Sequence, residues 1–240
     1  MRAVICGANG AMGKLLQQRF EDIAGLVSID GENGVARTFD ELGDVRPEVV
    51  VDFSHHSAAP QTTEYAVKEN CALVVGTTGH TEEEKAAILA AAKKIPVFYT
   101  GNMSLGIAVL CRLAKEAARS FPDADIEIVE IHHNRKVDAP SGTAKMLFDA
   151  VKEVRPQATA HCGRAGEGKR TSDEIGISYL RMGAIVGIHE VHICTGSQRL
   201  TLRHEACDRG MFADGAKAAA EFVAHKPAGL YNMENLLESR

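Results

Sequence analysis

The first hundred residues alternate between short apolar runs and longer amphipathic segments, and this alternation constrains the fold more than any other feature. The apolar runs are rich in β-branched residues and have few polar positions, as in strands of a parallel sheet that is covered on both faces. These runs lie at residues 3–6, 26–30, 49–54, 72–78 and 96–100. The pattern predicts a doubly wound α/β sheet with right-handed crossovers.

Helices are predicted between these runs at residues 11–24, 57–70 and 81–94. The last of them, "TEEEKAAILAAAKK", has Thr81 as a cap, acids in its first turn and lysines in its last turn. The short, glycine-rich segment 31–48 gives no clear helix.

The pattern changes after about residue 103. A helix is predicted at 104–120, and "DIEIVEIHH" (125–133) then alternates apolar and polar residues, like a strand with one solvent-facing side. A second helix is predicted at 142–154, and the polar, glycine-rich segment 155–174 is predicted to be a loop.

Three further strand-like runs, separated by glycine turns, are "IGISYLRMG", "IVGIHEVHICTG" and "QRLTLRHEA". They predict an open, mixed and mostly antiparallel sheet in an α+β domain. The strong helix former 211–225 is expected to return to the first domain. We therefore expect a dinucleotide-binding domain at 1–103, completed by 211–240, and a substrate-binding and oligomerisation domain at 104–210.

Charge and cysteine content exclude several classes of function. The net charge of -5 provides no overall positive field for nucleic acid or anionic membrane. The six cysteines are scattered, without the spacing of a zinc knuckle or redox dithiol, which favours reduced thiols in a cytoplasmic protein. No signal-peptide core and no apolar run near the roughly 20 residues of a membrane span is present, so we expect a cytoplasmic location.

The segment "CGANGAMGK" places Gly7, Gly10 and Gly13 between the first predicted strand and the first predicted helix. Such a turn aims backbone amides at a phosphate, whose charge the helix N-terminus favours. The spacing is G-x-x-G-x-x-G rather than the commoner G-x-G-x-x-G, and a plain tight turn is the alternative. Because the turn follows an N-terminal strand directly, we predict a Rossmann-like site for a dinucleotide.

Asp30 ends the second predicted strand, about 20 residues after the glycine turn, where an acid can accept hydrogen bonds from the adenosine ribose. Its neighbour is Gly31 rather than arginine, so a 2′-phosphate would meet a carboxylate with no adjacent cation. This favours NADH over NADPH, although Arg37 or Lys14 could supply charge from elsewhere. An ordinary acid at a strand end is the alternative.

Two more loops follow predicted strands at their carboxyl ends, "GTTG" (76–79) and "TGNM" (100–103). Ligands bind at this edge in open α/β sheets, and small residues there would let a nicotinamide ring lie against the backbone. Either stretch alone is more typical of a simple loop. His55 and His56 of "DFSHH" are assigned to a loop near the cofactor at most.

The stretch "EIHHNRKVDAPSGTA" (130–144) gathers His132, His133, Arg135 and Lys136 within five positions. On a strand, Glu130 and His132 share a face and His133 points the other way. Fixed lysine charge beside imidazoles suits an anion, and histidine can release a proton near neutral pH.

A helix is predicted to begin directly after this cluster, with Ser141 as its N-cap. The first amides, of Gly142 and Thr143, favour an anion. Together with the cluster they predict a carboxylate-binding corner. A structural role is the alternative for a single histidine, and metal is the rival use of a His-His pair. Successive strand residues face apart and no Asp or Cys completes a ligand set, so no metal is predicted.

"EIHHNRKVDAPSGTA" closely resembles the signature of the dihydrodipicolinate reductase family. The likeness covers essentially the whole chain and includes "GANGAMGK", "VVDFSHHSA", "VVGTTG", "TGNMSLGI", "RMGAIVGIHEV" and "DRGMFADGAKAAAEFV". It implies an NAD(P)H-dependent oxidoreductase that reduces 4-hydroxy-tetrahydrodipicolinate to tetrahydrodipicolinate in the diaminopimelate route of lysine biosynthesis. It also implies a dinucleotide-binding domain, a central domain that binds this small dicarboxylate, and a homotetramer.

The resemblance assigns roles by position. His132 matches the family's proton donor, and Lys136 matches its partner in catalysis and in substrate binding. The remaining substrate-binding positions are His133, Ser141, Gly142 and Thr143. The cofactor-binding positions are Gly7, Ala8, Asn9, Gly10, Ala11, Met12, Asp30, Gly76, Thr77, Thr78, Thr100, Gly101, Asn102 and Met103.

The chain departs from the family pattern near the cofactor. The region after Asp30 is trimmed, and Asp30-Gly31 replaces the acid–arginine pair of members that use both cofactors. Gly101 and Met103 stand where many members have Pro or Ala, and Phe. Two alternatives to the family's reaction are another Rossmann-type dehydrogenase of a small amino or hydroxy acid, and a non-catalytic NAD sensor.

Overall fold

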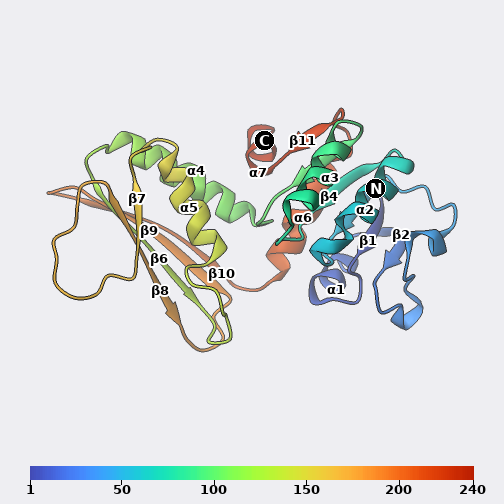
Figure 1. Cartoon of the computed structure of the whole chain (residues 1–240), viewed down its shortest axis with the longest axis horizontal. Coiled ribbons are helices and arrows are strands. Elements are labelled where there is room, and N and C mark those ends of the chain that lie inside the picture. The colour runs from blue at the N-terminus through green and yellow to red at the C-terminus, as the bar shows by residue number, and fades with distance from the viewer. The chain divides into compact units, whose positions relative to one another are not determined.

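A computed structural model describes residues 1–240, and the chain forms two compact units (Figure 1). The first unit comprises residues Met1–Ser104 and Gly210–Arg240, and the second comprises Leu105–Arg209. The second unit is therefore an insertion between two parts of the first.

The first unit contains a six-stranded sheet with the order β11-β5-β4-β3-β1-β2, in which every pair of neighbours is parallel. The strands are β1 (Arg2–Cys6), β2 (Asp22–Val27), β3 (Val49–Asp52), β4 (Ala72–Val75), β5 (Pro96–Tyr99) and β11 (Gly229–Tyr231). The order reverses at β1, so ligands are expected at the carboxyl ends of β1 and β3.

Helices cover both faces of this sheet. They are α1 (Ala11–Gln17), α2 (Ala59–Lys68), α3 (Glu82–Ala92), α6 (Gly210–Val223) and α7 (Met233–Glu238). The helices α1 and α6 pack together, as do α2 and α3. Val4 and Cys6 belong to the core under α2 and α3, whereas the alternate residues Ala3 and Ile5 are buried on the other face. This confirms the prediction of strands buried on both faces.

Several predicted boundaries in the first unit are wrong. Helix α1 ends at Gln17 rather than residue 24, because β2 begins at Asp22. Strand β2 ends at Val27, so Asp30 lies three residues beyond the strand rather than at its end. The strand is "DIAGLV", an edge strand paired only with β1, and its Ala and Gly give little strand signal.

The segment 31–48 contains no α-helix, in agreement with its weak signal. Two 3₁₀ helices form there, η1 (Glu32–Gly34) and η2 (Phe39–Leu42), and a third, η3 (His56–Ala58), precedes α2. The predicted capping box of α3 is present, since Thr81 and Glu84 exchange side-chain and backbone hydrogen bonds. The C-terminal elements β11 and α7 were not predicted, because each is too short for a periodic pattern.

The second unit contains a five-stranded sheet with the order β10-β9-β6-β8-β7. The strands are β6 (Asp125–His132), β7 (Thr159–Cys162), β8 (Glu174–Arg181), β9 (Gly187–Cys194) and β10 (Arg199–Ala206). The sheet is mixed, as predicted. The β10–β9 and β9–β6 pairs are antiparallel, whereas β6–β8 and β8–β7 are parallel. The unpredicted strand β7 lies in the segment taken for a loop, because its four exposed residues lack an apolar face.

Helices α4 (Leu105–Ser120) and α5 (Gly142–Lys152) pack on each other and lie on one face of this sheet (Figure 1). The inward positions of β6 follow a period of two. Ile126 and Ile128 are fully buried in the core, and the next inward residues are Glu130 and His132. The core of this unit therefore continues directly into a polar cluster. None of the helices in either unit has the length and apolarity that crossing a bilayer requires.

Candidate cofactor and substrate sites

The glycine turn joins β1 to α1 at the carboxyl edge of the first sheet. Gly7 has a φ of +77°, and a side chain there would collide with the carbonyl group of Phe53. A side chain at Gly13 would collide with the carbonyl groups of Gly7 and Ala8. Both positions therefore require glycine, Gly7 because of its backbone conformation and Gly13 because the helix approaches the turn so closely.

The start of α1 has donors suited to a phosphate. Gly10 is the N-cap residue, and no side chain caps the helix. The amides of the first helical turn, from Ala11, Met12 and Gly13, have no acceptor within the helix. A helix that starts on uncapped amides, behind a turn that begins and ends with glycine, fits the pyrophosphate of a dinucleotide.

Asp30 lies on the loop after β2 and is connected to the glycine turn. The Asn9 side-chain amide donates to Asp30 Oδ1 at 2.5 Å, and this hydrogen bond lowers the pKa of the carboxyl group. The side chain is exposed to solvent. Asp30 therefore offers an ionised acceptor beside the turn, although the strand itself ends earlier than the sequence suggested.

The Arg37 side chain lies against Gly31, the residue that follows Asp30. The segment doubles back so that Ala36 bridges to Val27, and the Ala36 amide donates to the Leu26 carbonyl at 3.0 Å. The Arg37 side chain covers Gly31, where an added methyl carbon would come within 2.6 Å of Arg37 Nε. The guanidinium group forms no ion pair. A cation therefore occupies the space that a side chain at position 31 would fill.

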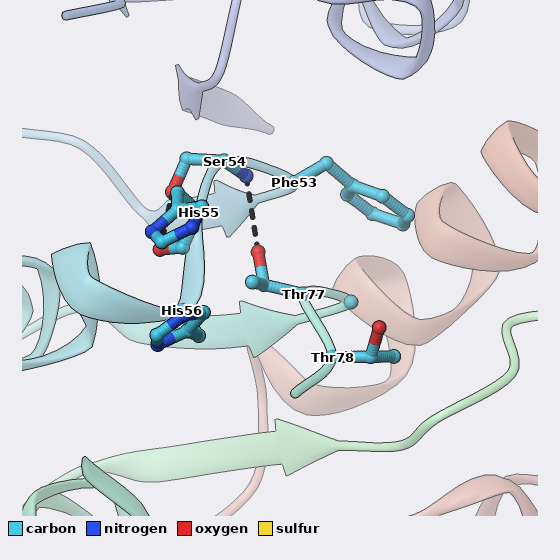
Figure 2. A pocket seen from close by; sticks show the side chains of 7 residues that line it. Phe53, Ser54, His55, His56, Thr77 and Thr78 are labelled. Atoms are coloured by element: carbon cyan, nitrogen blue, oxygen red, sulfur yellow. Dashed lines mark hydrogen bonds between the residues drawn. The ribbon is translucent and has the colours of Figure 1, made fainter. Parts of the chain in front are cut away.

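A pocket opens at the carboxyl ends of β3 and β4 (Figure 2). Its lining residues are Phe53, Ser54, His55, His56, Gly76, Thr77 and Thr78. The Ser54 amide donates to Thr77 Oγ1 at 3.0 Å, as Figure 2 shows, and the Phe53 ring lies against Gly76. Since Phe53 also touches Gly7, the predicted glycine turn and the predicted "GTTG" loop meet through one residue.

Buried polar groups lie beneath this pocket, and they were not predicted from the sequence. Asp52 is fully buried, burial raises the pKa of its carboxyl group, and Ser54 Oγ donates to its Oδ1 at 2.5 Å. Its second oxygen, Oδ2, has no hydrogen-bond partner. His56 Nδ1 lies 2.9 Å from the Glu84 carboxylate. His55 and His56, which were assigned to a loop near the cofactor at most, line this pocket.

The loop 100–103 follows β5. Thr100 Oγ1 donates to the Asn102 carbonyl at 3.1 Å, and Thr100 and Asn102 are partly exposed. Met103 is buried, and its carbonyl packs against Gly215 of α6. Ala8 is also buried. In this unit, Ala8 and Met103 can thus reach a ligand only through backbone groups, whereas Gly10, Ala11, Thr78 and Gly101 are exposed.

The predicted catalytic histidine, His132, ends β6 in the second unit. Its Nδ1 lies 2.6 Å from Glu130 Oε2, which confirms that the two side chains share a face. Glu130 is fully buried and His132 is 8% exposed. His132 Nε2 forms no hydrogen bond and so remains available to a ligand.

Glu130 also accepts hydrogen bonds from two other elements. Arg181, at the end of β8, donates to both carboxylate oxygens at 2.8 Å, and the Ser141 amide donates to Oε1 at 2.9 Å. Burial would raise the pKa of Glu130, but the hydrogen bonds from His132 and Arg181 outweigh it and lower the pKa to about 2. Glu130 is therefore a buried carboxylate anion.

The other basic residues lie on the turn after β6. Lys136 Nζ forms an ion pair with Asp138 Oδ1 at 2.7 Å and is partly exposed. The His133 amide donates to the Ile185 carbonyl at 2.8 Å, and burial of its ring, together with the charge of Arg135, lowers the pKa of His133. Since its pKa is lowered, His133 offers a neutral imidazole.

Helix α5 begins beside this turn. Ser141 is its N-cap, as predicted, because Ser141 Oγ accepts from the Ala144 amide at 3.2 Å. The same hydroxyl lies 3.1 Å from His189 Nε2 and is buried, so it is occupied within the protein. Gly142, which is exposed, and Thr143 supply the first amides of the helix. The sequence predicts a carboxylate-binding corner from these amides and Lys136, which lies on the turn between β6 and α5.

Two polar residues of this cluster, Arg181 and His189, were not predicted. His189 is buried, and burial together with the nearby His132 lowers its pKa to about 3, so it is neutral. Each residue reaches the site from a neighbouring strand, through register pairs that a single sequence does not reveal. The burial of Glu130 is indicated by the sequence, because Glu130 continues the buried face formed by Ile126 and Ile128.

Comparison with known proteins matches the two units to the two family models of one enzyme family. Residues 1–103 match the family model described as dihydrodipicolinate reductase, N-terminus, and residues 106–237 match that for its C-terminus. The chain is 39% identical over 242 residues to 4-hydroxy-tetrahydrodipicolinate reductase of Alkaliphilus metalliredigens, covering 99% of each. It is 41% identical over 251 residues to the enzyme of that name from Caldanaerobacter subterraneus, covering 99% of this chain and 98% of that one.

Solved structures agree with the sequence comparison. The dipicolinate-bound dihydrodipicolinate reductase from Paenisporosarcina sp. TG-14 aligns with a TM-score of 0.80 and 26% identity over 98% of both chains. A probable dehydrogenase from Thermotoga maritima aligns with a TM-score of 0.64, and at 11% identity it supports the fold alone. The two family models together span almost the whole chain, and this protein belongs to the dihydrodipicolinate reductase family.

Proposed function

We propose that this enzyme reduces 4-hydroxy-tetrahydrodipicolinate to tetrahydrodipicolinate with NAD(P)H, in the diaminopimelate route of lysine biosynthesis. The observation that carries the proposal is the arrangement at the end of β6, where Glu130 accepts hydrogen bonds from His132 and from the N-cap residue of α5. Lys136 lies on the turn between these two elements. Full-length relatives with this reductase name support the same reaction.

Substrate binding is assigned to the carboxylate-binding corner. A cyclic substrate with two carboxylates needs fixed positive charge and amide donors. Lys136 supplies the charge, and Gly142 and Thr143 supply amides at the positive end of α5. His133 adds a neutral imidazole at the same turn. Ser141 contributes by holding the start of the helix, since its hydroxyl is occupied as the cap.

His132 is assigned as the proton donor. Reduction of the unsaturated ring adds one hydride and one proton, after water has been lost from the hydroxylated precursor. The nicotinamide cofactor, when bound, supplies the hydride. His132 Nε2 delivers the proton, directly or through water, and the charge of Lys136 stabilises the negative charge that develops on the substrate. Positioning and charge neutralisation by these residues carry most of the rate.

Residues of the first unit are assigned to the cofactor. The amides of residues 10–12 bind the pyrophosphate, and Asp30 accepts from the adenosine ribose. Gly76, Thr77 and Thr78, with the backbone of 100–103, bind the nicotinamide end. We propose that NADH is preferred because of the Asp30 carboxylate, and that NADPH is also used because the Arg37 side chain lies against the neighbouring Gly31.

Assembly and location complete the proposal. Four large apolar side chains on or beside β8 and β10 remain exposed in the second unit, namely Tyr179, Leu180, Met182 and Leu200. We infer that this sheet forms the interface of a homotetramer, which light scattering of the purified protein tests. A cytoplasmic location fits the six free thiols.

A coupled assay tests the reaction. The substrate is formed from pyruvate and aspartate semialdehyde by a synthase, and loss of NADH or NADPH is followed separately by absorbance. The proposal expects substrate-dependent loss of both, faster with NADH. An NAD sensor would bind NADH without turnover, and an amino- or hydroxy-acid dehydrogenase would reduce NAD with its own substrate instead. Either result would contradict the proposal.

A further inference from the structure

Glu130 occupies an unusual place for a carboxylate. It is fully buried on the central strand β6, in line with the apolar residues Ile126 and Ile128. Burying a charge is costly unless the charge is fully hydrogen-bonded. Glu130 meets this condition, because Arg181, the Ser141 amide and His132 all donate to it. Three separate elements thus converge on one side chain.

The ionised state of Glu130 determines which nitrogen of His132 carries a proton. A carboxylate anion accepts hydrogen bonds and has none to donate. At the 2.6 Å contact, His132 Nδ1 must therefore be the donor. In the neutral ring Nε2 is then the unprotonated nitrogen, and in the cationic ring Nε2–H is the group that can be donated.

The surroundings of His132 Nε2 leave space for a ligand. Gly187, on the neighbouring strand β9, has no side chain, and a methyl carbon there would lie 3.0 Å from His132 Nε2. The His189 ring packs against His132 edge-on, with centroids 5.0 Å apart, and it fixes the ring plane. Glu130 therefore holds one side of the imidazole while the other side stays open.

The same carboxylate also holds the start of α5. The Ser141 amide donates to Glu130 Oε1 while Ser141 Oγ caps the helix. One buried anion thus connects the assigned proton donor to the helix whose first amides are assigned to the substrate. Arg181 clamps that anion through two hydrogen bonds and also donates to the Asp138 carbonyl, on the turn that carries Lys136.

We propose that Glu130, clamped by Arg181, is a positioning residue that keeps a proton on His132 Nδ1 and thereby directs Nε2 to the substrate. The proposal rests on the proposed function, because it assumes that His132 is the proton donor. The charged and titratable groups around His132 are Glu130 on its own strand, Arg181 on β8, His189 on β9, and His133, Lys136 and Asp138 on the following turn.

Nitrogen-15 NMR of the full-length wild-type protein, labelled at histidine, tests the proton position without any assay. His132 signals are assigned as those missing from His132→Gln. In the neutral ring at high pH, we expect a protonated Nδ1 and an unprotonated Nε2. A neutral ring protonated at Nε2, or one that exchanges freely between the two forms, would overturn the proposal. Because this experiment uses the wild-type protein, it is informative even if variants of Glu130 fail to fold.

Kinetics of Glu130→Gln test the consequence for turnover. A glutamine side chain can donate as well as accept a hydrogen bond, so this variant no longer fixes which nitrogen of His132 carries the proton. We expect kcat to fall about ten- to a hundredfold while KM changes less than about threefold. Glu127→Gln is the matched control, since Glu127 pairs with Arg170 on the opposite face of the same strand, and it should leave kcat and KM unchanged.

The outcomes separate the two proposals. If the wild-type protein reduces the substrate and Glu130→Gln is folded with an unchanged kcat, the positioning role is wrong and the proposed function stands. If the wild-type protein does not turn over, the proposed function is wrong, and the NMR result alone decides whether Glu130 fixes the His132 tautomer.

Discussion

Lys136 Nζ lies 2.7 Å from Asp138 Oδ1, so the ammonium group assigned to the substrate is already paired within its own turn. The Lys136 side chain is 21% exposed, and that of Asp138 is 51% exposed. A substrate carboxylate must therefore compete with Asp138 for this ammonium, or share it. Asp138 thus offers a simple way to change substrate affinity without changing the assigned catalytic groups.

Replacing Asp138 tests this competition. Asp138→Asn keeps the shape of the side chain and removes its charge, so we expect KM for the substrate to fall about two- to fivefold, with kcat nearly unchanged. Steady-state kinetics at low ionic strength measures the effect. An unchanged or higher KM would mean that Asp138 does not compete with the substrate but orients Lys136 for it.

Replacing either His132 or Lys136, the two residues assigned to catalysis, is expected to have a larger effect on kcat. His132→Ala and Lys136→Ala should each lower kcat by roughly 10²–10⁴, because each removes a proton donor or a stabilising charge. His161→Ala and Lys169→Ala, at exposed positions of the same unit, are matched controls and should retain activity. Near-normal turnover in both His132→Ala and Lys136→Ala would rule out the assignment.

The position of Arg37 leads to a prediction about the relative kcat/KM values for NADPH and NADH. Without its guanidinium group, a 2′-phosphate would face the Asp30 carboxylate alone, so Arg37→Ala should lower kcat/KM for NADPH about ten- to a hundredfold. The value for NADH should change less than about twofold. Arg46→Ala is the control, since Arg46 is an exposed arginine paired with Asp44 in the same unit. Equal losses for both cofactors would contradict a role for Arg37 at the phosphate.

The lowered pKa of Glu130 predicts a loss of stability in acid. A carboxyl group whose pKa is lower in the folded state than the ordinary value of 4.5 stabilises the fold above that value. The contribution is lost as pH falls from about 4.5 toward 2, and for this buried group it amounts to about 3 kcal/mol. Urea unfolding followed by circular dichroism between pH 7 and pH 3 measures it. Glu130→Gln should be less stable at neutral pH and lose less stability in acid than the wild-type protein. Parallel curves would contradict the prediction.

The first sheet could be predicted from the sequence because nearly every residue of its central strands is apolar. Runs such as 49–54 and 72–78 read as strands without any knowledge of their partners. The edge strand β2 could not be recognised in this way, since most of "DIAGLV" is only partly buried and its first residues were assigned to the preceding helix. As a result Asp30 was placed at a strand end, although it lies on the following loop.

The candidate sites were predictable where they are continuous in sequence. The glycine turn and the stretch 130–144 contain most of their own partners within a few residues. Arg181, His189 and the position of Arg37 depend on which strands or loops lie side by side. That arrangement follows from packing of the whole unit, so no local pattern reveals it.

The end of β6 and the start of α5 are assigned as the binding site for a ring that bears two carboxylates. A crystal structure of this enzyme with dipicolinate and NADH tests it most directly. We predict that the carboxylates contact Lys136 and the amides of Gly142 and Thr143, with His132 Nε2 facing the ring. Dipicolinate bound elsewhere on the chain, with Lys136 still paired to Asp138, would contradict the account.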